Sequence, residues 1–194
     1  MKIFLTTSAA IAAAVAVAAP AAAQKVPAPS IAIVDLGRVS SECTACKPAA
    51  AALQSQVAAL RSRQQQLTTS LQGEGAGIQT AVNALAGKTP DAALTARIRA
   101  LQAKQDAANQ ELQRQQQQIQ RNQAYIQQQI DTRLGPVIEQ VMARRGANVV
   151  LEASSALRSA PALDVTTDVL TSLNAALPSL VTTAPAAPAA PTRR

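Results

Sequence analysis

Residues 94–126 read LTARIRALQAKQDAANQELQRQQQQIQRNQAYI. The apolar residues in this stretch recur at multiples of seven positions, in two interleaved series. Such a repeat is typical of a helix that packs an apolar seam against a second helix. One series consists of Leu94, Leu101 and Ala108, and the other of Ile98, Leu112, Ile119 and Ile126. The stretch therefore predicts one arm of a coiled coil.

The chain before this stretch carries the same repeat. Its two series are Leu53, Leu60 and Leu67, and Val57, Leu71, Ile78 and Leu85. The helix-breaking sequence GKTPD at residues 87–91 separates the two repeats. Two arms joined by a short turn must pack antiparallel, so we expect a helical hairpin over residues 47–146 with its tip near residues 86–91. Arms of about 40 residues would extend on the order of 60 Å.

Polar residues interrupt the seam in both arms, and glycines interrupt the first arm. Each polar residue at a seam position lowers the stability of a coiled coil, which favours flexible arms. Gly73, Gly75 and Gly77 fall within five residues, and each glycine inside a helix costs roughly 1 kcal/mol relative to alanine. We interpret them as a hinge; a local kink without a role is the alternative. The polar seam positions are Gln64, Glu74, Gln105, Gln115 and Asn122.

Strand-like and helix-like segments flank the hairpin. Two runs rich in β-branched residues are typical of buried strands: IAIVDL at residues 31–36 and NVVL at residues 148–151. Asp164 and Thr166 are candidate caps for a last helix that Pro178 would end. Residues 30–46 and 147–180 together predict a small body of about 50 residues, a size at which an isolated core is marginal. The predicted fold class is thus α+β and mostly α, with the hairpin projecting from a body that needs to oligomerise.

The two ends of the chain have their own composition. Residues 1–23 resemble a secretion signal, with Lys2, an apolar run up to Ala19, and small residues before Gln24. We therefore expect cleavage there, a short lead at residues 24–29, and a soluble periplasmic protein. Residues 181–194 are rich in proline and alanine and predict a disordered tail.

The composition argues against several classes of function. The chain contains no histidine, which removes histidine-based acid/base chemistry and histidine-ligated zinc. Aromatic residues make up 1% of the chain, whereas proteins that bind single-stranded nucleic acid use aromatic faces for stacking. We predict a protein that is not an enzyme, with no catalytic residue, metal or cofactor and no nucleic-acid partner.

The order of these parts resembles the OmpH/Skp family of periplasmic chaperones over roughly residues 30–177. The resemblance is carried by IVD at residues 33–35, RV at 38–39, VVLE at 149–152, and APALDVT at 160–166 followed by DVL at 168–170. It implies a homotrimer with a shared β body, whose three hairpins enclose a cavity for unfolded outer-membrane proteins. The implied activity is ATP-independent holding. A structural coiled-coil spacer or adaptor of the cell envelope is the alternative.

The arms carry an excess of positive charge. Residues 47–146 contain twelve basic residues and six acidic ones, and the formal net charge of the whole chain is +7. Such arms would attract acidic clients and, weakly, anionic lipid head groups; a merely solvated face is the alternative. The residues predicted to steer clients or anions are Arg61, Arg63, Lys88, Arg97, Arg99, Lys104, Arg114 and Arg121.

Cys43 and Cys46 depart from the family pattern. A disulfide is the expected state of such a pair in an oxidising compartment. A redox-exchanging thiol pair and a metal site at the trimer axis are the alternatives. An oxidoreductase centred on this pair is a third class of function, but the sequence lacks the strand–helix–strand unit in which such motifs usually lie.

Overall fold

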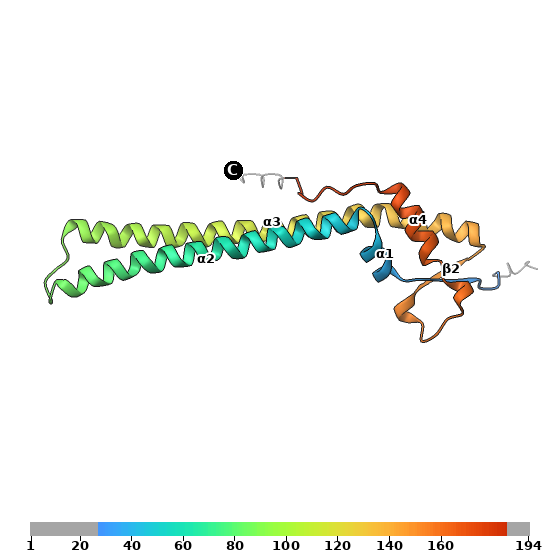
Figure 1. Cartoon of the computed structure of the whole chain (residues 1–194), viewed down its shortest axis with the longest axis horizontal. Coiled ribbons are helices and arrows are strands. Elements are labelled where there is room, and N and C mark those ends of the chain that lie inside the picture. Colours follow the sequence, from blue (N-terminus) through green and yellow to red (C-terminus); the bar gives the residue numbers. More distant parts are fainter. Residues whose placement is uncertain (1–26, 186–194) are drawn as a thin grey trace, which may run out of the picture.

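The structure, a computed structural model, describes residues 27–185. A long two-helix hairpin projects from a small body at one end (Figure 1). The predicted signal peptide at residues 1–23, part of the predicted lead and residues 186–194 of the predicted tail lie outside the described residues. The predicted α+β, mostly helical fold is confirmed for the part that the structure describes.

The hairpin consists of helix α2, Cys46–Ala84, and helix α3, Ala92–Arg145. They contain 39 and 54 residues and lie side by side in opposite directions (Figure 1). The turn between them uses Gly87 at a φ of 91°, a conformation that favours glycine. The Asp91 side chain caps α3 by accepting the Leu94 N–H at 2.7 Å. The turn therefore combines a glycine that reverses the chain with an N-cap that starts the next helix.

The seam between the arms is thinly packed. Leu94, Ala108 and Ile126 are buried, but most other seam residues are only half-buried. Asn122, one of the polar seam positions, is 3% exposed and donates to the Gln56 side-chain oxygen at 2.8 Å. Because two helices alone leave much of their surface in water, the main core must lie elsewhere.

The body contains a parallel sheet built from two distant parts of the chain. Strand β1, Ile31–Val34, pairs with strand β2, Val149–Glu152, in a register that sets Ile31 opposite Val149. On the other side of β1, Val165 donates its N–H to the Ile33 carbonyl oxygen at 2.9 Å. Strand β1 is thus central, and within the described residues the outer edge of β2 has no strand partner.

Helices cover one face of this sheet. Helix α1, Leu36–Glu42, and helix α4, Thr166–Ala176, pack there with the last turns of α3. Short 3₁₀ turns at Ala153–Ser155 and Pro161–Leu163 complete the connection between β2 and α4. The side chains that are almost wholly excluded from water are Val34, Val39, Cys43, Val141, Thr166, Val169 and Leu173. The hydrophobic core of the chain therefore lies in the body.

The other face of the sheet is apolar and partly open, since Ile33 on this face is only 5% exposed. Ile31, Val149 and Leu151 are 36–39% exposed. Alternate residues of a strand point to opposite faces, so these three share the face opposite to Ala32 and Val150, which belong to the core side. A sheet face in contact with water normally carries polar side chains. This face has the composition of a covered surface.

Asp164 and Thr166 connect β1 to α4. Asp164 accepts the Thr166 N–H at 2.8 Å, while the buried Thr166 hydroxyl oxygen accepts the Asp35 N–H at 2.9 Å. The hydrogen bonds from Thr166 lower the pKa of Asp164, because they stabilise its charged form. The N-cap of α4 is Val165, without a side-chain cap hydrogen bond, so neither predicted residue is the cap. Asp164 binds the first N–H of α4 from one position before the cap, and Thr166 links α4 to the end of β1.

Candidate functional site

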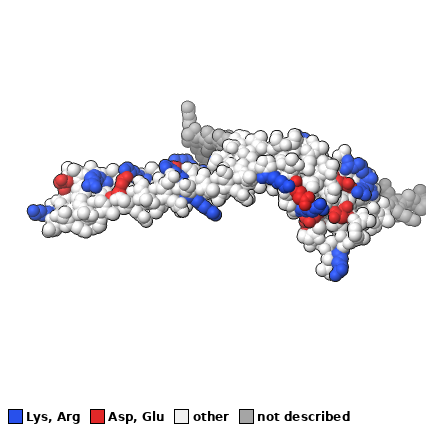
Figure 2. All heavy atoms as spheres, in the orientation of Figure 1, with Lys and Arg blue, Asp and Glu red and all other residues white. Residues whose placement is uncertain are grey.

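The basic residues predicted to steer clients are spread along the arms. Figure 2 shows Lys and Arg side chains at intervals along the visible face of the hairpin, with few acidic side chains among them. Seven of the eight are exposed and Arg121 is half-buried. The structure therefore does not bring these residues together into one compact site.

Two of the predicted steering residues form ion pairs between the arms. Arg63 on α2 contacts Glu111 on α3 at 2.7 Å, and Lys104 on α3 contacts Glu74 on α2 at 2.7 Å. The hydrogen bond from Arg63 lowers the pKa of Glu111 and raises that of Arg63. Such exposed pairs contribute little to stability, but they partly neutralise the charge of these two cations.

The remaining cations differ in their availability. Arg121 donates to the side-chain oxygen of Gln118, and its Nε is buried without a hydrogen-bond partner among the described residues. The other five form no ion pair within residues 27–185. These five unpaired and exposed cations are Arg61, Lys88, Arg97, Arg99 and Arg114.

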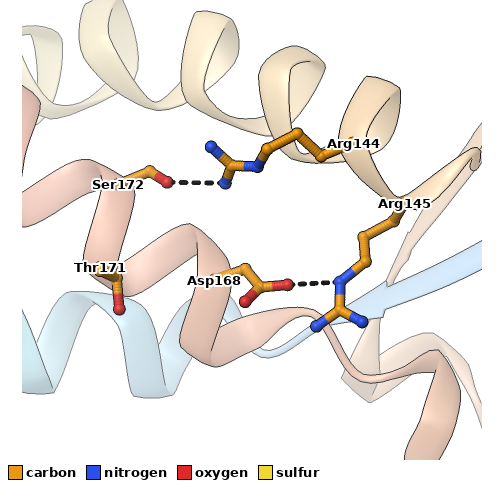
Figure 3. Close-up of a pocket in the computed structure, with 5 residues that line it drawn as sticks. All are labelled: Arg144, Arg145, Asp168, Thr171 and Ser172. Carbon is orange, nitrogen blue, oxygen red and sulfur yellow. Dashed lines mark hydrogen bonds and ion pairs between the residues drawn. The ribbon is translucent and has the colours of Figure 1, made fainter.

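The basic end of α3 packs against α4 in the body. Arg145 contacts Asp168 on α4 at 2.6 Å, and Arg144 donates to the Ser172 hydroxyl at 2.9 Å (Figure 3). The hydrogen bond to Asp168 raises the pKa of Arg145. Both side chains therefore fasten α4 to the end of the hairpin.

The glycine cluster lies inside an unbroken helix. Helix α2 continues through Gly73, Gly75 and Gly77. A Cβ at Gly75 would lie 3.9 Å from Leu101 and one at Gly77 would lie 3.7 Å from Arg97, which are ordinary contact distances. Close approach of the arms therefore does not require glycine here, and the hinge remains a prediction about motion.

Cys43 and Cys46 form a disulfide in the structure, with their Cα atoms 5.0 Å apart. Both residues are buried, at 0% and 6% exposure, where α1 meets the start of α2. Within the described residues, no group of three or more His, Cys, Asp or Glu side chains could hold a metal ion.

The chain after α4 lies along the base of the hairpin, which the sequence did not lead us to expect. Residues 178–185, which we call the C-terminal strap, follow the two arms back from the body (Figure 1). The predicted disordered tail begins at residue 181, and in residues 181–185 the structure shows main-chain groups that are hydrogen-bonded to arm side chains. Proline and alanine content gave no sign of this contact, which depends on glutamine and asparagine residues far away in the sequence.

Four side-chain amides hold the strap. They come from both arms and include the seam residue Asn122, which accepts the Ala184 N–H at 2.8 Å. A shallow groove between α2 and α3 lies beside them, lined by Leu60, Ile119 and Thr183 among others. We call the four amide residues the amide ladder: Gln56, Gln118, Asn122 and Gln129.

None of the helices in the described part of the chain is both long and apolar enough to cross a membrane.

Comparisons with known proteins agree with this architecture. A crystal structure of a candidate outer membrane chaperone (OmpH-like) from Caulobacter crescentus CB15 has a similar fold, with a TM-score of 0.66 and 21% sequence identity. The similarity covers 81% of this chain and 90% of that chain. At this identity the likeness shows the fold alone. A comparison with curated proteins found no match.

The family assignment comes from the sequence itself. The model of the family described as outer membrane protein (OmpH-like) matches residues 30–173. This match spans β1, both arms, β2 and most of α4. The chain therefore belongs to the OmpH-like family.

Proposed function

We propose that this protein is an ATP-independent holding chaperone of the periplasm, which sequesters unfolded outer-membrane proteins between the flexible arms of a homotrimer. The observation that carries the proposal is the surface of the arms. It offers exposed cations and main-chain-binding amides along two long helices, and so many weak contacts instead of one compact site. Such contacts would keep exposed client strands from pairing with one another.

The body supports the trimeric part of the proposal. Its sheet has an open apolar face and, within the described residues, an unpaired β2 edge. An exposed sheet edge next to apolar side chains is a template for pairing with another chain. A shared body would cover both features and would hold the arms at a common centre.

The alternative of a structural spacer has its own support. Helix α2 is unbroken through the glycine cluster, and the two ion pairs join the arms, which suits a stiff rod. A spacer would need no affinity for unfolded proteins. Client binding therefore separates the two functions.

The deciding experiment measures the mass of the mature protein by light scattering, followed by turbidity after addition of a urea-diluted outer-membrane barrel protein. We expect a trimer that keeps the barrel protein soluble in a discrete complex. A trimer that leaves the barrel protein to aggregate would favour the spacer. A monomer would contradict the shared body.

Neutralising unpaired cations on one arm should slow client capture. The double substitution Arg97→Gln and Arg99→Gln removes two exposed charges from α3, and we expect the association rate to fall roughly threefold at low salt. The difference should shrink at high salt, because salt screens exposed charges. Stopped-flow mixing with a labelled barrel protein measures both rates.

The matched control makes the same change of net charge in the body. Arg38→Gln and Arg158→Gln replace two exposed residues outside the arms, of which Arg38 is paired with Glu42 at 3.1 Å. Equal slowing by both double variants would show that only net charge matters and that the arms do not steer the client. Vesicles with and without anionic lipid, mixed with the same proteins, would test the proposed weak contact with anionic head groups.

A further inference from the structure

We infer that the amide ladder is a binding site for the main chain of an extended, unfolded polypeptide, and that the C-terminal strap occupies this site until a client displaces it. The inference rests on the proposed chaperone function and assigns it a place on the arms. Its occupant in the free protein is a segment of the same chain.

Gln129 binds the strap as one peptide group binds another. Its side-chain Nε2 donates to the Val181 carbonyl oxygen at 2.9 Å, and its Oε1 accepts the Val181 N–H at 3.0 Å. One side-chain amide thus satisfies both polar main-chain groups of one residue. The Val181 side chain remains 55% exposed, so the contact grips the main chain and not the side chain.

The other three residues of the amide ladder form a connected hydrogen-bond network. Asn122 accepts the Ala184 N–H at 2.8 Å, while Gln118 donates to the Ala184 carbonyl oxygen at 3.4 Å and to Asn122 at 2.7 Å. From the opposite arm, Gln56 donates to the Thr182 carbonyl oxygen at 3.4 Å and accepts from Asn122 at 2.8 Å. The buried Asn122 is therefore held in place by partners on both arms, which fixes the direction of its acceptor oxygen.

The spacing of the ladder matches an extended chain. Gln129 and Asn122 are seven residues apart, which is about 10.5 Å along a helix. Val181 and Ala184, which they bind, are three residues apart, and three extended residues span about 10 Å. Gln115 continues the same series one heptad further along α3. A longer extended polypeptide could therefore meet amides at regular intervals along the arm.

The chemistry of the ladder indicates which partner it fits. A side-chain amide offers one acceptor oxygen and two donor hydrogens, the same groups that a peptide bond presents. Binding through these groups does not depend on the partner's sequence. It does require a main chain with free N–H and C=O groups, a condition that an unfolded polypeptide meets and a folded barrel does not. Asn122, one of the polar residues that weaken the seam, thus acquires a role in recognition.

The test detaches the strap without changing its length or charge. The double substitution Val181→Pro and Ala184→Pro removes the two N–H groups that the ladder accepts. We expect the Kd of a labelled, urea-diluted outer-membrane barrel protein to fall roughly three- to tenfold, because the binding site is then vacant in a larger fraction of molecules. Val181→Ala, which keeps the N–H, is the matched control and should leave the Kd within twofold.

A second substitution tests the ladder itself. In the detached background, Gln129→Ala should raise the Kd again, whereas Gln120→Ala, at an exposed glutamine of α3, should not. Unchanged binding in both steps, with a wild-type protein that still keeps the client soluble, would overturn the ladder and leave the chaperone function intact. Failure of the wild-type protein to bind the client would overturn the proposed function instead, so the two failures are distinct.

Discussion

Replacement of Leu173 by alanine is expected to lower the free energy of unfolding by about 3 kcal/mol. Leu173 lies on α4 with 0% exposure and packs in the same core as Val34 and Val169. Its truncation removes apolar contacts and leaves a cavity between α4 and the sheet. The loss should be large relative to the whole, because this body contains nearly all of the fully buried side chains.

Urea denaturation at fixed protein concentration measures this loss, since assembly would make the midpoint depend on concentration. Leu157→Ala is the matched control, because Leu157 is fully exposed in the single chain. We expect the control to change the free energy of unfolding by less than about 0.5 kcal/mol. A cost below about 1 kcal/mol for Leu173→Ala would mean that the α4 contact with the sheet is not a principal source of stability.

Replacement of Leu151 by aspartate is expected to convert the proposed homotrimer into monomers. Leu151 is 39% exposed on the open face of the sheet, and its partner on the neighbouring strand is Ile33. In the single chain the new carboxylate would remain in water at little cost. In an assembly that covers this face, it would be buried without a partner, at a cost of several kcal/mol in each copy.

Light scattering over a range of concentrations measures the outcome, and circular dichroism checks that the helices remain. Ser159→Asp introduces the same charge at an exposed residue of the body and should keep the mass of the wild-type protein. A Leu151→Asp variant that retains the wild-type mass would show that this sheet face is not the interface between copies.

The arms could be predicted from the sequence because their signal is local. A seven-residue repeat on each side of a glycine–proline turn leaves few alternatives to two antiparallel helices. Helix α1 was not foreseen, because its seven residues LGRVSSE hold too short an apolar pattern to distinguish a helix from a loop. Its N-cap, Asp35, accepts the Arg38 N–H at 2.8 Å and is the signal that was available.

The candidate functional surface was less predictable, because it depends on the register between the arms. Arg63 and Glu111 are 48 residues apart, so their pairing follows from how α2 lies against α3 and not from either helix alone. The strap was missed for a similar reason. Its partners Gln129 and Asn122 are 52 and 62 residues before the groups they bind, and glutamine in a helix ordinarily indicates only a solvated position.

The parallel pairing of β1 with β2 has a consequence for how the chain acquires its structure. The hydrogen bond beside this pairing joins Ser30 to Asn148, across 118 residues. Contacts between the arms can form step by step, starting at the tight turn that joins them. Pairing of the two strands closes a loop that contains the whole hairpin, and closing so long a loop costs entropy and is slow. During synthesis, β1 emerges first and must wait for nearly the entire protein before its partner exists. We therefore expect the hairpin to form first and to bring the two strands together.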